Sequence, residues 1–250
     1  MLHFTQSKSH GPRLPRRLVS ASEHEAWQRL LLDIYSRMRQ RAQAGPYDTF
    51  CAGIQIAVLP EVYAPGFFSD SCWFASVLPE VVGSGSLLEV GTGTGIIAIA
   101  CAKRGASVVA TDINPCAIEN ARMNAKRHRL KIDVRMGDLY SASRQEERFD
   151  FIFWAHPFNN WNEPVSDVLM KSGRDYRYQS LKGYIHRARN HLNETGRLLL
   201  GTGDSADIDA IECMARDAGY ELRVLRQVDM PIEEGGTEPV TYLLVEFARV

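Results

Sequence analysis

A glycine-rich turn between two apolar runs constrains the fold of this chain more than any other feature of the sequence. Residues 86–90 are largely apolar, glycines follow at positions 91, 93 and 95, and residues 96–102 are apolar again. This order predicts a strand, a tight turn and a helix. Glycine lets the backbone bend sharply there and approach a ligand without Cβ atoms in the way.

An acidic residue closes the next apolar run. Residues 107–111 predict a second strand, and Asp112 follows it directly. A carboxylate at the end of a strand can accept hydrogen bonds from both hydroxyls of a ribose. Together the turn and this acid predict that the chain binds a nucleoside-containing cofactor.

The rest of the sequence alternates strand and helix patterns. A first strand is expected at 54–59, and seven more at 86–90, 107–111, 132–136, 149–154, 196–202, 220–228 and 240–248. Helices are expected at 22–44, 70–82, 95–104, 114–128, 177–192 and 205–217. Alternation of this kind predicts parallel strands with crossover helices on both faces, whereas the short loop between the last two strands forces them to pair antiparallel. We expect a doubly wound, Rossmann-like α/β fold with a mostly parallel seven-stranded sheet and a C-terminal antiparallel hairpin.

The N-terminal third of the chain differs from this pattern. Residues 1–20 lack periodicity and are expected to form a disordered tail. Ser22 and Glu25 make a capping-box pattern, and apolar residues at helical spacing follow it. We expect residues 21–82 to form a helical and strand extension that serves as a lid, and residues 83–250 to form the main domain.

The charge distribution leaves two interpretations of the N-terminal region. The formal net charge of the chain is −1, so the total charge does not demand nucleic acid or a membrane surface. Residues 1–44 nevertheless carry eight lysines and arginines against three acidic residues. This basic arm is either a solvated helix face with a loose tail or a surface for RNA phosphates.

Cysteine usage and hydropathy indicate the compartment. The cysteines at 51, 72, 101, 116 and 213 are scattered without a Cys-x-x-Cys motif or a Cys/His cluster, which argues against a metal site and a disulfide framework. We expect reduced, buried or half-buried thiols. The N-terminus lacks an apolar signal segment and no run reaches transmembrane length, so a cytoplasmic protein without a membrane partner is expected.

The spacing of glycines and acids bears on which nucleoside cofactor binds. The pattern is Gly-x-Gly-x-Gly with Ile96 next, whereas a dinucleotide fingerprint reads Gly-x-Gly-x-x-Gly. Glu89, inside the first strand of the motif, would repel a pyrophosphate but suits a ligand with an ammonium group. Asp138 follows the third strand, where it suits an adenine amino group. These acids together with Asp112 indicate S-adenosyl-L-methionine, whose product is S-adenosyl-L-homocysteine.

Several motifs resemble those of class I S-adenosylmethionine-dependent methyltransferases. Residues 88–95, 110–115, 137–138 and 149–153 are similar to motifs I to IV of that superfamily. Residues 62–66 and 117–125 resemble its HemK-like branch, which includes the release-factor glutamine methyltransferases. The resemblance covers roughly residues 54–250 and implies methyl transfer, a transferase activity.

By this resemblance the cofactor lies on the glycine turn and the acidic strand ends. Asp112 would bind its ribose, Ile113 would pack on its adenine and Asp138 would hold the adenine amino group. Two alternatives stay open. Asp112 could instead cap the helix that opens with Asn114-Pro115, and Asp138 could serve only to form a turn. The expected cofactor-binding residues are Glu89, Gly91, Thr92, Gly93, Gly95, Asp112, Ile113, Asn114, Asp138, Leu139 and Ala155.

The end of the fourth strand departs from the HemK-like pattern. That pattern reads Asn-Pro-Pro-Tyr, and its Asn side chain accepts from the N–H of the methyl acceptor, but here the residues are Ala155-His156-Pro157-Phe158. Ala155 has no side-chain amide, so the resemblance does not imply methylation of a glutamine or a nucleobase. Backbone carbonyls at 155 and 156, or the nearby Asn159 and Asn160, are alternative acceptors of that hydrogen bond.

His156 is the candidate catalytic residue. Methyl transfer depends mainly on alignment and exclusion of water, but an amine or hydroxyl acceptor must also lose a proton, which suits a histidine base. A histidine that only bonds the backbone in a tight turn is the alternative. The long segment 159–176 is expected to close over the substrate with helix 22–44. The expected substrate-binding residues are Pro157, Phe158, Asn159 and Trp161, with Trp154, Glu163, Asp175 and Tyr176 as further candidates.

The sequence therefore predicts a cytoplasmic S-adenosylmethionine-dependent methyltransferase that acts on nitrogen or oxygen of a small molecule, in a biosynthetic pathway. Three alternatives stay open. The first is a protein glutamine or peptide N-methyltransferase, and the second is an RNA methyltransferase that uses the basic arm. The third is a cofactor-binding protein without catalysis, which Ala155 would allow.

Overall fold

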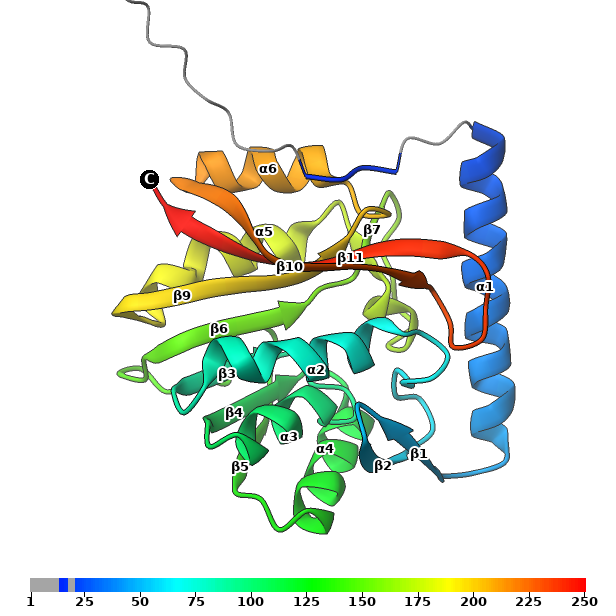
Figure 1. Cartoon of the computed structure of the whole chain (residues 1–250), viewed down its shortest axis with the longest axis horizontal. Helices are drawn as coiled ribbons and strands as arrows, with labels where there is room; N and C mark the ends of the chain where they lie inside the picture. Colours follow the sequence, from blue (N-terminus) through cyan, green and yellow to red (C-terminus); the bar gives the residue numbers. More distant parts are fainter. Residues whose placement is uncertain (1–13, 18–20) are drawn as a thin grey trace, which may run out of the picture.

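A seven-stranded sheet forms the centre of the computed structural model, which describes residues 14–17 and 21–250. The strand order is β10-β11-β9-β6-β3-β4-β5 (Figure 1). The strands are β3 (Ser86–Val90), β4 (Ser107–Asp112), β5 (Ile132–Met136), β6 (Phe149–Ala155), β9 (Leu192–Gly203), β10 (Tyr220–Pro231) and β11 (Pro239–Arg249). Strands β3 to β6 and β9 run parallel, whereas β11 pairs antiparallel with both β9 and β10. The expected fold class is confirmed.

Helices cover both faces of this sheet because successive strand residues point to opposite sides. Helices α2 (Asp70–Val82), α3 (Ile96–Lys103) and α4 (Pro115–Arg127) share a core with Leu87 and Phe153. Helices α5 (Gln179–Arg187) and α6 (Ile208–Asp217) share the other core with Leu88 and Ile152. The expected helix 177–192 is shorter in the structure, since a 3-10 turn, η2 (Ala188–Asn190), replaces its last part.

Two small strand pairs lie outside the sheet, and only one of their strands was expected. Strands β1 (Tyr47–Cys51) and β2 (Ile54–Val58) form an antiparallel hairpin. Strands β7 (Asn159–Trp161) and β8 (Arg174–Tyr176) pair in parallel, with a 3-10 turn, η1 (Met170–Ser172), between them. Segments of three residues carry too little periodicity to be recognised in the sequence.

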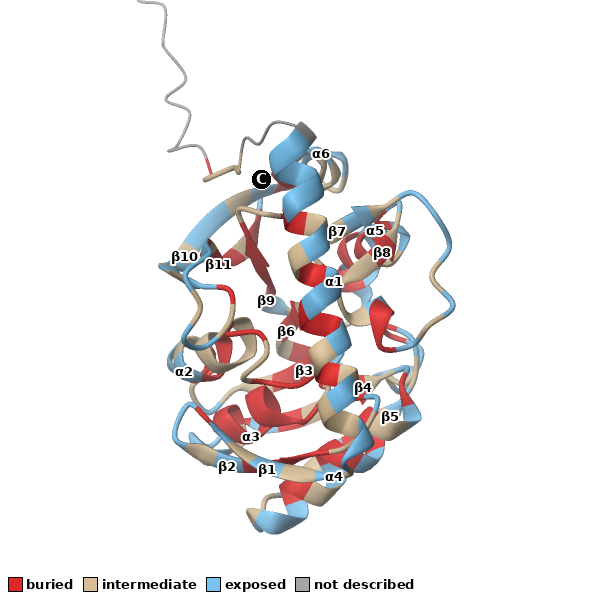
Figure 2. Ribbon diagram, turned by 90° about the vertical axis from the view of Figure 1, so that its right-hand side faces the viewer, coloured by how far each residue is buried: buried red, intermediate tan, exposed pale blue. Residues whose placement is uncertain are grey.

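Helix α1 (Ala21–Gln43) stands across the carboxyl ends of the parallel strands (Figure 2). Its buried side chains recur at helical spacing and face inward, where Ile34 is fully buried. They pack against side chains from distant segments, including Phe68, Leu169 and Tyr242. The helix therefore closes one side of the molecule.

Two buried asparagines join the hairpin β1–β2 to helix α4. Asn124 of α4 accepts from the backbone N–H of Ala57 at 2.8 Å and donates to the carbonyls of Ala57 and Thr94. Asn120 accepts from the N–H of Leu59 at 2.9 Å and donates to the carbonyl of Ala57. Buried backbone groups need hydrogen-bond partners. These two side chains therefore supply the hydrogen bonds that a neighbouring strand would give to β2.

The structure describes residues 14–17 of the expected tail and the whole of the expected lid segment 21–82. Residues 1–13 and 18–20 of the expected disordered tail lie outside the described residues. Residues 14–17 do not form a free tail, because Leu14 is buried and Arg16 bonds Asp209 and Glu212 of α6. Within the segment 21–82, helix α2 packs against one face of the sheet, whereas helix α1 stands over the strand ends.

Cys51 and Cys72 form a disulfide with a Cα–Cα distance of 5.0 Å, which corrects the expectation of five reduced thiols. The sequence does not reveal this pairing because the residues are 21 positions apart and meet only where the β1–β2 hairpin packs on α2. Cys101 is buried and Cys116 half-buried, as expected, but Cys213 is exposed. No helix within the described ranges has the length and hydropathy needed to cross a membrane.

Candidate active site

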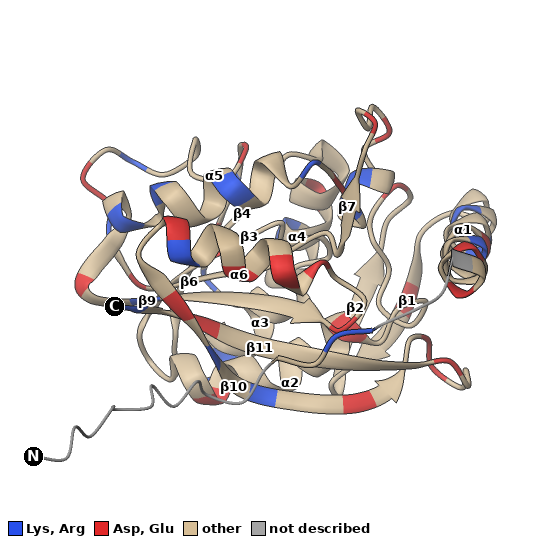
Figure 3. Ribbon diagram, turned by 90° about the horizontal axis from the view of Figure 1, so that it is seen from above, with Lys and Arg blue, Asp and Glu red and all other residues tan. Residues whose placement is uncertain are grey.

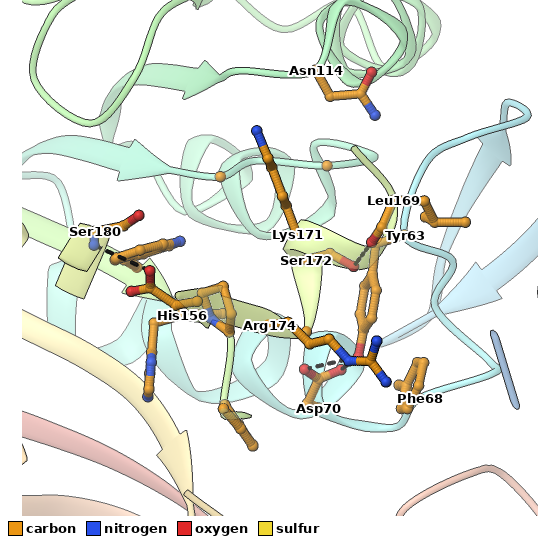
Figure 4. Close-up of a pocket in the computed structure, with 18 of the residues that line it drawn as sticks. Tyr63, Phe68, Asp70, Asn114, His156, Leu169, Lys171, Ser172, Arg174 and Ser180 are labelled. Carbon is orange, nitrogen blue, oxygen red and sulfur yellow. Dashed lines mark hydrogen bonds between the residues drawn. The ribbon is translucent and has the colours of Figure 1, made fainter. Parts of the chain in front are cut away.

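A cavity of about 550 Å³ opens at the carboxyl ends of the parallel strands. One part of its wall is backbone and strand-end residues of β3, β4 and β5, and the other part comes from α1, the segment 61–71, the segment 154–180 and β11 (Figure 4). We call the first part the cofactor half and the second part the acceptor half. Ligands of doubly wound sheets bind at this edge.

The glycine turn forms the floor of the cofactor half. Gly91 has φ 66°, and a Cβ there would lie 2.8 Å from Nε1 of Trp154. Gly95 has φ 82°, and its Cβ would lie 3.0 Å from the Cα of Ala121 on α4. Side chains at these positions would both strain the backbone and collide with neighbours. The expectation that this turn requires glycine therefore has a steric basis at both ends.

Glu89 lies behind the turn and does not line the cavity. It is 1% exposed and accepts a hydrogen bond from Oγ1 of Thr92 at 2.7 Å. Burial raises the pKa of Glu89 to about 8, and the nearby charge of Asp112 adds to this shift. The structure thus places Glu89 as a support of the turn, with Thr92 between it and the cavity.

Asp112 faces the cavity from the end of β4. Its two oxygens accept from the backbone N–H groups of Gly93 and Asn114, each at 2.9 Å. Burial raises the pKa of Asp112, although these bonds oppose the shift. Asn114, not Asp112, caps α4: it accepts from the N–H of Cys116 at 2.9 Å and donates to the carbonyl of Glu61 at 2.6 Å. The cap alternative for Asp112 is therefore removed.

The remaining cofactor candidates lie beside Asp112. The backbone N–H of Gly137 donates to the carbonyl of Asp112 at 2.9 Å, which brings the ends of β4 and β5 together. Asp138 is exposed and Leu139 buried on the cavity wall. Ile113 is 43% exposed there, which is unusual for a large aliphatic side chain at a strand end.

Ala155 and His156 line the acceptor half where it adjoins the cofactor half, because β6 pairs with β3. His156 is 2% exposed, and its Nε2 lies 2.9 Å from Oγ1 of Thr202. Burial lowers the pKa of His156 to about 3, so the ring is neutral near neutral pH. Its Nδ1 is buried and has no hydrogen-bond partner among the described residues. A ring in this state is a weak proton acceptor, and as a neutral imidazole it has one donor and one acceptor nitrogen for hydrogen bonds.

The segment after β6 is held in place by its own contacts. Asn159 donates to the carbonyl of Gly173 at 2.7 Å and accepts from Gln28 of α1 at 3.4 Å. Tyr178 donates to the carbonyl of Phe158. Pro157, Phe158 and Asn159 line the cavity, as do Trp154, Asp175 and Tyr176, although Asp175 also caps α5 through Ser180 and Leu181.

Trp161 and Glu163 lie outside the main cavity. Both line a smaller cavity of about 340 Å³ on the other side of Phe158. The guanidinium of Arg174 stacks on the Trp161 ring at 3.9 Å, and this contact occupies one ring face. Trp161 therefore shares the smaller cavity with Phe158 and Asn159 but does not line the main cavity.

The acceptor half contains residues that sequence reasoning missed. It is lined by Tyr35 of α1, Tyr63 and Phe68 of the loop between β2 and α2, Asp70 of α2 and Tyr242 of β11. Tyr63 lies in the motif 62–66, which resembles the HemK-like branch, but the motif did not predict a role in the site. The other four carried no signal, because they come from segments that meet only after α1 has packed across the sheet.

A glycine turn with acidic residues at the next strand ends of a doubly wound sheet is typical of class I methyltransferases, and the comparisons with known proteins agree. The sequence profile of the methyltransferase small domain family matches residues 54–217. A putative protein N5-glutamine methyltransferase of Methanocaldococcus jannaschii is 31% identical over 192 residues, which cover 73% of this chain and 92% of that protein. The chain belongs to the methyltransferase small domain family.

More distant similarities point to the same fold. The ribosomal RNA small subunit methyltransferase C of Haemophilus influenzae is 32% identical over 116 residues, which cover 46% of this chain and 31% of that protein. The structure of the T. thermophilus 16S rRNA N2 G1207 methyltransferase with AdoMet and guanosine has a TM-score of 0.59 at 17% identity. That match covers 82% of this chain and 50% of the other. The protein is thus an S-adenosylmethionine-dependent methyltransferase with HemK-like relatives, as expected.

The residues present fit this cofactor. The turn offers a surface free of side chains at Gly93, where an added Cβ would meet no atom within 4 Å. Asp112 presents a carboxylate with further acceptor capacity, and Ile113 presents an apolar surface beside it. When bound, S-adenosylmethionine supplies a methyl group activated by its sulfonium centre.

Proposed function

We propose that this methyltransferase acts on a small molecule bound in the acceptor half of the cavity. The observation that carries the proposal is the position of α1 over that half. Trp27, Leu31 and Tyr35 of α1 line the cavity, so the helix covers part of the acceptor half. Small-molecule sites are typically concave, largely apolar pockets with a few polar groups.

The charge of the N-terminal region also favours a small acceptor over RNA. Arg16 and Arg17 pair with acidic residues of the same chain, and so do Arg37 and Arg39 of α1. Figure 3 shows basic and acidic residues intermixed along α1. An RNA-binding surface needs cationic side chains that can pair with phosphates. Internal ion pairs reduce the number of such side chains in this region.

The chain's own residues contribute mainly alignment. The glycine turn and Asp112 hold one reactant, and Phe158, Pro157 and the rings under α1 position the other in a site from which water is excluded. His156 lies where the two halves adjoin, as a neutral ring. Its low pKa favours a hydrogen-bonding role toward the acceptor over the role of general base.

A protein glutamine acceptor is the second candidate. The M. jannaschii relative, whose description names that activity, matches this chain over 92% of its own length. The residue at the end of β6 opposes it, since Ala155 lacks the amide that would grip a carboxamide. The second candidate therefore requires a different group to hold the glutamine side chain.

Methyl-labelled S-adenosylmethionine separates these candidates. The enzyme is incubated with the low-molecular-mass, protein and RNA fractions of a cell extract, and the label is followed in each. We expect label in the low-molecular-mass fraction. Label in glutamine side chains of the protein fraction, or in RNA, would overturn the proposal. Asp112→Ala serves as the control that shows which labelling depends on the cofactor half.

A further inference from the structure

Asp70 is a carboxylate set among aromatic rings in the acceptor half. Its two oxygens each lie 3.3 Å from the hydroxyl of Tyr63, and Figure 4 shows Tyr63, Phe68 and Asp70 close together. The Tyr63 and Phe68 rings stack at 4.9 Å, and the Tyr35 and Phe68 rings are 5.4 Å apart. The charge of Asp70 also reaches Tyr35 and Tyr242. The carboxylate therefore faces rings from α1, the 61–68 loop and β11.

This carboxylate has no ion-pair partner in the described part of the chain. Arg174 and Lys171 line the same cavity, but neither pairs with Asp70, and the Arg174 guanidinium stacks on Trp161. Burial raises the pKa of Asp70 to about 6. Its Oδ1 also accepts from the N–H of Ser71 at 2.6 Å and from the Ser71 hydroxyl at 3.3 Å, in the first turn of α2. Oδ2 has the Tyr63 hydroxyl as its one partner among the described residues, so this oxygen keeps acceptor capacity.

We propose that Asp70 and the surrounding rings bind the amino group of the acceptor, which is therefore an amine methylated on that nitrogen. This inference rests on the proposed small-molecule function and names its substrate class. Aromatic faces attract a cation, and a carboxylate in a dry site adds a charge-assisted hydrogen bond. A neutral alcohol can still donate a hydrogen bond to the carboxylate, but it gains neither the cation–π attraction nor the attraction between opposite charges.

The same carboxylate accepts the proton that the ammonium group must lose before its nitrogen can be methylated. The acceptor ammonium gives one proton to Asp70 and becomes an amine with a free lone pair. That nitrogen forms a bond to the donor methyl carbon while the carbon–sulfur bond breaks, and the electron pair of the broken bond stays on sulfur. The product leaves as a methylammonium ion, and Asp70 returns its proton to solvent. Atoms and charge balance without a further reactant.

Matched probes test this inference. The full chain is saturated with S-adenosylhomocysteine, and calorimetry measures its affinity for tyramine, benzylamine and tryptamine against the alcohols of the same skeletons. We expect at least one amine to bind about tenfold more tightly than its alcohol. Asp70→Asn should remove that preference, whereas Glu80→Gln, on the exposed side of the same helix, should keep it. The amine affinity should rise as pH increases through about 6, where Asp70 ionises.

Three results would overturn the inference. The first is equal binding of every amine and its alcohol, and the second is a preference for amines that survives in Asp70→Asn. The third is a loss of S-adenosylhomocysteine affinity in Asp70→Asn, which would assign Asp70 to the cofactor half. Each can occur while label still enters the low-molecular-mass fraction, so failure of this inference is distinct from failure of the proposed function.

Discussion

The two halves of the cavity are built in different ways. The cofactor half consists of backbone and short side chains at the ends of neighbouring strands, within one continuous stretch of sequence from residue 90 to residue 139. The acceptor half consists of side chains from α1, two loops, α2 and β11, which are far apart in the chain. The first half depends on local geometry, and the second depends on how distant elements pack.

A glycine substitution should break the cofactor half most strongly. In Gly91→Ala the new Cβ would sit at φ 66° and 2.8 Å from Trp154. We expect a loss of about 3 kcal/mol of unfolding free energy and a marked loss of S-adenosylhomocysteine affinity. Gly45→Ala, at φ 89° with nothing within 4 Å, should cost only about 1 kcal/mol. Urea unfolding and calorimetry measure both, and equal costs would refute the steric account.

Removing the strand-end carboxylate should weaken the cofactor half without unfolding it. Asp112→Asn keeps the shape of the side chain but loses the charge-assisted bonds to a ribose. We expect the Kd for S-adenosylhomocysteine to rise roughly tenfold to hundredfold. Asp133→Asn on the neighbouring strand β5 is exposed and should leave the Kd unchanged. An unchanged Kd in Asp112→Asn would remove this residue from the cofactor site.

The ionisation of Asp70 in the acceptor half should make the free energy of unfolding depend on pH. The folded chain raises the pKa of Asp70 from 3.8 to about 6, so it holds this proton more tightly than the unfolded chain does. The resulting stabilisation is fully present below pH 3.8 and is lost as pH rises to about 6. It amounts to roughly 2 kcal/mol after allowance for partial exposure. Asp70→Asn should lack this loss in urea unfolding at several pH values, and a parallel profile would contradict it.

The residue where the two halves adjoin should have the smallest effect. Because burial lowers the pKa of His156 to about 3, the ring does not titrate near neutral pH. We expect His156→Asn to lower kcat about tenfold or less and to leave the shape of the rate profile unchanged. A limb of the pH–rate profile near the ordinary histidine pKa that disappears in the variant would restore His156 as the general base.

The same contrast explains what the sequence predicts. Strand, turn and helix around Gly91 follow from periodicity and glycine spacing within one short stretch, so the cofactor half could be predicted. The position of Asp70 at the start of a helix was predicted, but its ring neighbours Tyr35 and Tyr242 lie in elements whose meeting depends on tertiary packing. The disulfide between Cys51 and Cys72 escaped prediction for the same reason.

His156 marks a second limit. Its identity suggested a base because the ordinary pKa of histidine lies near neutrality. Burial decides its actual protonation, and burial is a property of the folded chain that no residue pattern at 154–158 conveys. The chemical type of a residue was therefore predictable, whereas its electrostatic state was not.

The buried pair Asn120 and Asn124 has a consequence for how this protein can be divided. Both residues are 0% exposed, and their partners are backbone groups at 57, 59 and 94. A fragment that began at residue 83 would keep these asparagines, lose most of their hydrogen-bond partners and expose to water the apolar surface that the hairpin covers. We therefore expect a fragment for excision or grafting to need residues 47–82 together with the Rossmann-like portion.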